Sequence, residues 1–87
     1  MESGLETVCR VCGLDVGEVR FDEHGLALFV ICECCGTESG VSDGIVAQAR
    51  RVRGHWLDAG STWFEPKARP AEWELQQQLR NIPPGWR

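Results

Sequence analysis

Apolar residues follow different rhythms in the two halves of this chain. Residues 16–21 and 26–31 are rich in valine, isoleucine, leucine and phenylalanine, which favour extended backbone. Between them lies the sequence Asp-Glu-His-Gly at 22–25, which has the composition of a turn. Gly25 can adopt the positive φ that a tight turn requires. The first half therefore predicts a β-hairpin.

The second half has a helical rhythm. Apolar residues recur at steps of four, three and four along one stripe, at Ile45, Ala49, Val52 and Trp56. This spacing predicts a helix from Ile45 to about Ala59, with Ser42 or Asp43 as its cap and Gly60 as its stop signal.

A second, shorter helix is expected from Ala71 to Arg80, before the prolines and glycine of 83–85 end it. Its core-facing residues would be Trp73 or Leu75, Leu79 and Ile82. The remaining large aromatic residues also fit best in the core: Trp56, Trp63, Phe64 and Trp86.

With 87 residues, the chain has room for one small domain and a single core. We expect a ribbon at 7–36, a polar linker at 37–44, a helical part at 45–82 and a tail at 83–87. A domain of this size is near the limit at which burial alone stabilises a fold, so a metal or disulfide staple is expected.

Paired cysteines supply that staple. Cys9-x-x-Cys12-Gly (the first knuckle, residues 9–13) and Cys32-x-x-Cys35-Gly (the second knuckle, residues 32–36) are separated by nineteen residues between Cys12 and Cys32. Two such pairs joined by a hairpin can form a tetrahedral shell of four thiolates, which suits zinc. The predicted fold is thus a small α+β domain, a zinc-ribbon β-hairpin followed by two helices.

Other chemistries fit the four cysteines less well. A redox dithiol needs one Cys-x-x-Cys pair at a helix start, whereas a single iron bound as in rubredoxin uses the same ligands and stays open. A shell of four thiolates leaves no position for substrate, so the metal is expected to be structural and the chain not to be an enzyme. His24 and His55 are expected at the surface. Cys34 is expected to be a small buried residue, with an alternative ligand or a reactive thiol as the other interpretations.

Charge is divided unevenly along the chain, whose net charge is −4. Residues 1–43 hold two arginines against nine acids, a net charge of −7, and residues 44–87 hold seven basic residues against four acids, a net charge of +3. An acidic ribbon repels phosphate backbones, so nucleic acid is an unlikely partner. The basic run Arg50, Arg51 and Arg53 is more typical of a solvated helix face than of a contact patch.

The sequence pattern does not predict a targeting signal. The N-terminus is acidic and lacks the basic start and apolar core of a signal peptide. The longest apolar run, residues 26–32, is far too short to cross a bilayer. Five cysteines, an odd number, favour metal ligation in the reducing cytoplasm over disulfides.

Taken together, these marks resemble the bacterial cysteine-rich CPCC family, small proteins of largely unknown function. The resemblance covers roughly residues 9–82. It rests on both knuckles, with Glu33 in place of the family's proline, and on a series of further marks: Gly40, Asp43, Trp56 to Gly60, Trp63-Phe64, Pro70, Trp73, Gln78-Leu79 and Asn81-Ile82-Pro83. It implies a zinc ribbon and, more loosely, a place among toxin–immunity loci.

From these features we expect a zinc-binding module that binds another protein in fixed ratio. An immunity-type inhibitor of a bacterial toxin domain is one form of it, because an acidic ribbon suits a basic partner. The alternative is a nucleic-acid-associated zinc ribbon that contacts phosphates through Arg50, Arg51 and Arg53.

Overall fold

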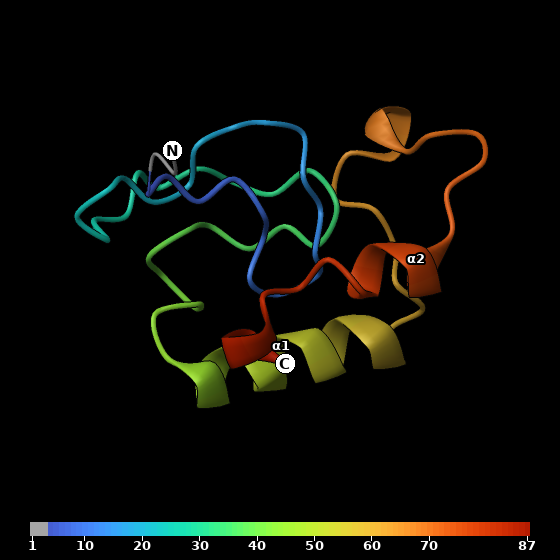
Figure 1. Cartoon of the computed structure of the whole chain (residues 1–87). Coiled ribbons are helices and arrows are strands. Elements are labelled where there is room, and N and C mark those ends of the chain that lie inside the picture. Colours follow the sequence, from blue (N-terminus) through green and yellow to red (C-terminus); the bar gives the residue numbers. More distant parts are fainter. Residues whose placement is uncertain (1–3) are drawn as a thin grey trace.

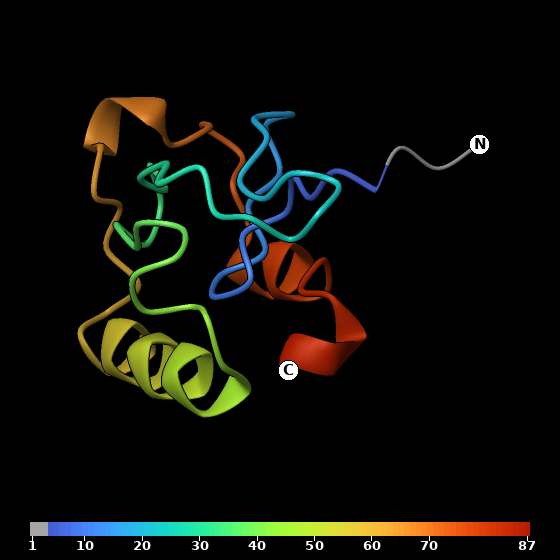
Figure 2. The same cartoon turned by 90° about the vertical axis from the view of Figure 1, so that its left-hand side faces the viewer.

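The computed structural model describes residues 4–87. It contains two α-helices, α1 (Val46–Asp58) and α2 (Leu75–Leu79), and two 3-10 turns, Pro66–Ala68 and Pro84–Trp86. Figures 1 and 2 show both α-helices on one side of the molecule and the irregular chain that carries the cysteines on the other side. Among the described residues, no helix is long and apolar enough to cross a membrane.

The prediction of a zinc-ribbon β-hairpin is wrong. No β-strand forms within residues 4–87; extended backbone pairs only at isolated antiparallel bridges. These bridges join Glu6 to Phe21, Phe21 to Ala27, Val8 to Asp15 and Ile31 to Glu38. The expected turn does form, because the Gly25 N–H donates to the Asp22 carbonyl at 3.0 Å and Gly25 has a φ of 78°.

Residues with positive φ explain why the pairing does not extend into a ladder. A β-strand needs a run of extended residues, and each left-handed residue reverses the direction of the chain. Gly17 (φ 81°) and Phe29 (φ 55°) interrupt the two β-forming runs. The Val30 N–H then donates to the Ser39 hydroxyl, where a ladder would place a backbone carbonyl. The composition of the runs favours strands locally, but each run is broken after one pair.

Helix α1 matches the expected helix to within one residue at each end. Ala49 and Trp56 are buried, as the apolar stripe predicts, and Val52 packs against the core. The cap was predicted wrongly: Ile45 is the N-cap residue, no side chain caps the helix, and Ile45 is 59% exposed. At the other end Gly60, with a φ of 100°, follows the last helical turn, in agreement with its expected role.

Helix α2 is shorter than expected, with five residues from Leu75 to Leu79. The helix begins later than expected because Pro70 and the turn that follows it keep residues 71–74 irregular. Ile82 is buried, and Trp73, Leu75 and Leu79 pack against the core, as predicted. Gln78, a polar residue, is the buried member of α2.

The core joins both halves of the chain. It gathers cysteines of both knuckles with apolar residues of the helical part: Cys9, Val11, Cys12, Leu14, Cys32, Cys34, Ala49, Trp56 and Trp63. Trp63 and Trp73 meet edge to face, with their centroids 5.5 Å apart. Phe64 was expected in the core, but more than half of it is exposed. The cysteine knuckles therefore form part of the core against which the helical part packs.

Candidate metal centre

The two knuckles have the same backbone geometry. In the first, the Gly13 N–H donates to the Cys9 carbonyl at 2.9 Å, and the Cys9 N–H donates to the Leu14 carbonyl at 2.8 Å. In the second, Gly36 donates to Cys32 at 2.9 Å and Cys32 donates to Thr37 at 2.9 Å. Each Cys-x-x-Cys-Gly segment is thus one closed turn that directs both of its cysteines to the same side.

The sulfur atoms of the two knuckles converge on one point. The Sγ atoms of Cys9, Cys12, Cys32 and Cys35 all lie within 4.8 Å of one another. Across the knuckles, Cys9 and Cys35 have their sulfurs 3.7 Å apart, and Cys12 and Cys32 have theirs 3.6 Å apart. A tetrahedral zinc with bonds of about 2.3 Å would place its sulfur ligands about 3.8 Å apart. Four close cysteines of this spacing could hold a metal ion.

Proton sharing between the sulfurs also favours a cation at this point. The hydrogen bond between Cys12 and Cys32 lowers the pKa of Cys32 and raises the pKa of Cys12, because one sulfur keeps the proton that the other accepts. Four thiolates at this distance, three of them buried, repel one another, so they cannot all ionise without a compensating charge. A divalent metal supplies that charge and binds the thiolate form.

Glycine ends each knuckle for two reasons. Gly13 and Gly36 have φ values of 87° and 78°, a region that side chains disfavour. A Cβ atom at Gly13 would collide with the backbone carbonyl oxygen of Gln78, and one at Gly36 would meet the Phe64 ring at 3.0 Å. The trailing glycines therefore allow the turns to form and also allow the helical part to approach them closely.

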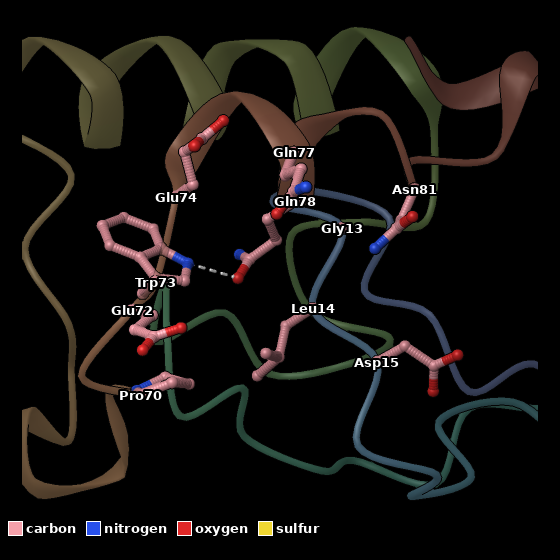
Figure 3. A pocket seen from close by; sticks show the side chains of 10 residues that line it. All are labelled: Gly13, Leu14, Asp15, Pro70, Glu72, Trp73, Glu74, Gln77, Gln78 and Asn81. Carbon is pink, nitrogen blue, oxygen red and sulfur yellow. Dashed lines mark hydrogen bonds between the residues drawn. The ribbon is translucent and has the colours of Figure 1, made fainter.

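Gln78 joins the two knuckles from α2, and Figure 3 shows its side chain beside Trp73. Its Nε2 donates to the Cys12 carbonyl at 3.2 Å and to the Cys34 sulfur at 3.3 Å. Its Oε1 accepts a 2.7 Å hydrogen bond from the Trp73 indole N–H. The sequence marked Gln78 only as part of the resemblance and did not predict these contacts, because a lone glutamine on a short helix does not indicate its bonding partners.

Cys34 is buried and lies outside the group of four close cysteines. Its sulfur faces the Gln78 amide, and its carbonyl accepts a 2.9 Å hydrogen bond from the Phe64 N–H. The neighbouring pair repeats this contact, with the Glu65 N–H donating to the Glu33 carbonyl at 2.8 Å. Cys34 therefore anchors the second knuckle to the helical part.

A stacked arginine holds the chain around the first knuckle. The guanidinium of Arg10 lies 3.6 Å from the centroid of the Phe21 ring and 4.1 Å from that of Trp86. It forms a two-pronged ion pair with Glu6, at 2.9 and 2.8 Å, and donates to the Asp43 carbonyl at 3.0 Å. A residue inside the first knuckle thus joins the N-terminal segment, the 37–44 segment and the C-terminal turn.

Two arginines of the basic run on α1 also bind backbone. Arg53 donates to the carbonyls of Arg10, Val11 and Trp86, and Arg50 donates to the carbonyl of Arg87. Arg51 is exposed. The run is therefore largely a set of internal contacts to the first knuckle and the C-terminal turn.

The histidines lie at the surface and outside the group of four cysteines. His24 is exposed in the turn, 3.7 Å from the carboxylate of Glu23, and His55 is exposed near the end of α1. A hollow of about 400 Å³ lies between the first knuckle and α2, with carboxylates of Asp15, Glu72 and Glu74 among its lining (Figure 3). Its ten lining residues include no serine, cysteine or histidine.

Comparison with known proteins found no family model, no curated protein and no solved structure that matches this chain.

Proposed function

We propose that this chain is a zinc-binding module that acts by binding another protein in fixed ratio, with the metal as its scaffold. The observation that carries the proposal is the cluster of four cysteine sulfurs within 4.8 Å at the centre of the fold. The cluster lies between the two knuckles and belongs to the core that the helical part covers.

Zinc is the metal that the donor set favours. Four soft thiolates in a tetrahedral arrangement suit zinc, and in this chain Cys9, Cys12 and Cys32 are buried while Cys35 is half-buried. Four protein ligands complete the coordination of the ion, so substrate has no open position there. A metal in this place would stabilise the fold and hold the two knuckles together.

The charge distribution supports a protein partner that carries positive charge. The first 43 residues contain two basic residues, Arg10 and Arg20, and both are buried. The described surface of residues 4–43 therefore presents carboxylates without an exposed lysine or arginine. Such a surface attracts a basic partner and raises the rate of its association.

A specific form of this function is an immunity-type inhibitor that occludes a basic toxin domain of a bacterium. The resemblance of the two knuckles and of the marks that follow them to the CPCC family supports this form. An inhibitor acts by occupying a surface, which requires a rigid scaffold and no chemistry of its own.

Two measurements test the proposal. Reduced, chelator-free protein is expected to contain one zinc per chain by elemental analysis; protein without stoichiometric metal would refute the metal part, and stoichiometric iron would change only its identity. Tagged protein expressed in its native cells is expected to retain one other protein in a fixed molar ratio through gel filtration. If no protein is retained in fixed ratio, the binding part is wrong.

A further inference from the structure

The segment 26–31 is the most apolar part of the described surface. Four of its apolar residues are each more than two fifths exposed: Leu26, Leu28, Phe29 and Ile31. Figure 1 shows this blue-green part of the chain running from the turn at 22–25 toward the second knuckle. Exposed apolar side chains concentrated in one segment are typical of a surface that contacts another molecule.

Phe29 is held in a conformation that its side chain disfavours. Its φ of 55° lies in the left-handed region, where glycine and asparagine are the usual residues. Phe29 is 61% exposed, and its ring lies beside Gly40, where a Cβ atom would approach the ring to 3.2 Å. Burial in the core does not account for an aromatic residue that is both exposed and strained. Strain of this kind clusters at binding sites.

Backbone groups in the segment 26–31 alternate between residues that form hydrogen bonds within the protein and residues that do not. The Leu28 N–H donates to the Arg20 carbonyl, and the Val30 carbonyl accepts from the Ser39 N–H. Phe29 and Ile31 form no hydrogen bond with any residue that the structure describes. The N–H and C=O groups of both residues are therefore available to form hydrogen bonds with a partner.

Carboxylates stand at both ends of the segment. Asp22 bonds to the backbone of Leu26 at one end, and Glu38 is paired with Ile31 at the other, which puts both side chains of that pair on one face. The hydrogen bond from the Leu26 N–H lowers the pKa of Asp22, so this carboxylate is charged at neutral pH. Arg20, whose carbonyl the segment contacts, is only 2% exposed and offers no cation to the surface.

We infer that the segment 26–31 is the contact surface of the module, and that its partner is a protein segment that carries lysine or arginine among apolar residues. This inference rests on the proposed function and adds the location and the chemistry of the contact. The apolar side chains of the partner would cover Leu28, Phe29 and Ile31. Its basic side chains would reach Asp22 and Glu38, and its backbone would pair with the free groups of Phe29 and Ile31.

Substitution of Phe29 separates a binding role from a structural one. Phe29→Gly removes the ring and allows the backbone to keep its φ without strain, and Phe29→Asn does the same with a second tolerated residue. Both variants are expected to keep the metal content and the melting temperature of the parent. Ile45→Ser, at a residue of similar exposure beside α1, is the matched control.

The binding experiment selects random peptides, displayed on phage, on the immobilised metal-loaded protein. Enriched peptides are expected to be basic with interspersed apolar residues, and to bind Phe29→Gly and Leu28→Ser roughly tenfold more weakly while binding Ile45→Ser normally. Glu38→Gln should lower the affinity for these peptides, and the loss should be larger at low salt than at high salt. The inference is overturned by an absence of enriched peptides, by enrichment of neutral or acidic ones, or by binding that Phe29→Gly leaves unchanged.

Two further outcomes separate this inference from the proposed function. If the protein retained from native cells binds Phe29→Gly as well as it binds the parent, the module still binds a protein, but through another surface. If sedimentation shows a dimer that Phe29→Gly abolishes, the segment is covered by a second copy of the chain, and the basic partner is wrong.

Discussion

Arg53, on α1, donates a 2.6 Å hydrogen bond from its Nε to the carbonyl oxygen of Val11, inside the first knuckle. Its Nη2 donates to the carbonyls of Arg10, at 2.9 Å, and Trp86, at 2.6 Å. A planar guanidinium can bond to several carbonyls at once, which an ammonium group cannot do in the same geometry. Through this one side chain, the helix, the first knuckle and the C-terminal turn are fixed relative to one another.

Replacing Arg53 by lysine is therefore expected to destabilise the protein by about 1–3 kcal/mol, because buried carbonyls lose their donors. Chemical denaturation of the metal-loaded protein measures the change. Arg51→Lys, two residues away at an exposed position, is the control and should change stability by less than about 0.5 kcal/mol. Equal effects of the two substitutions would mean that the contacts of Arg53 contribute nothing measurable.

The same contacts bear on nucleic-acid binding. Arg50 and Arg53 are engaged with backbone carbonyls, and the described surface of residues 4–43 carries no exposed lysine or arginine. Binding to duplex DNA or RNA at physiological salt is expected to be no tighter than the non-specific range of about 10⁻⁴–10⁻⁶ M. Gel-shift titration tests this. A salt-sensitive nanomolar complex that Arg50→Glu with Arg51→Glu abolishes would establish the nucleic-acid alternative in its place.

The sequence predicted the helical part better than the first half, for a physical reason. An apolar stripe at helical spacing is read within one element, so α1 and the burial of Ala49 and Trp56 follow from local pattern. Strand pairing depends on the backbone of every residue in a run. The left-handed conformation of Phe29 and the Val30 bond to Ser39 break the run, and neither is visible in a residue pattern.

The residue pattern also could not predict side-chain hydrogen bonds between residues that lie far apart in the sequence. The juxtaposition of the four cysteines was predictable because both turns share the pattern Cys-x-x-Cys-Gly, which is typical of the two halves of one metal site. Gln78 and Arg53 were not, because their bonds to the knuckles span 66 and 42 residues and use carbonyl oxygens that every residue has. Expected capping by Ser42 or Asp43 failed similarly, since Asp43 is buried and accepts the Gly40 N–H at 2.7 Å.

Gly13 and Gly17 form a natural pair for testing how closely α2 approaches the first knuckle. Both have similar positive φ values, 87° and 81°, so alanine at either costs about 1–2 kcal/mol from the backbone. At Gly17 the new Cβ meets nothing within 4 Å, whereas at Gly13 it collides with the Gln78 carbonyl. Gly13→Ala is therefore expected to lower stability by about 3 kcal/mol or more and Gly17→Ala by less than 2 kcal/mol. Thermal denaturation compares them, and equal losses would contradict the observed packing of α2.

Gln78 can be tested against its neighbour Gln77, which is exposed. Gln78→Leu leaves the Trp73 indole N–H without its acceptor and the Cys12 carbonyl without its donor, so a loss of about 2–3 kcal/mol is expected. Gln77→Leu should have little effect. In the Gln78 variant the fluorescence of Trp73 is also expected to shift, because its indole N–H loses its hydrogen-bond acceptor. An unchanged stability in that variant would show that apolar packing replaces these bonds at no cost.

Serine substitution of individual cysteines tests the metal centre itself. Cys9→Ser and Cys32→Ser each remove one sulfur from the group of four, so both are expected to lose stoichiometric metal and, with it, the folded state. Cys34→Ser should retain the metal, because its sulfur lies outside that group, although it loses the contact with Gln78. Elemental analysis and circular dichroism of the three variants decide between these expectations. Cys35→Ser provides the decisive comparison with Cys34→Ser, since the two residues are adjacent in the second knuckle. If Cys35→Ser keeps the metal and Cys34→Ser loses it, Cys34 is the fourth ligand, and the knuckle must rearrange when the metal binds.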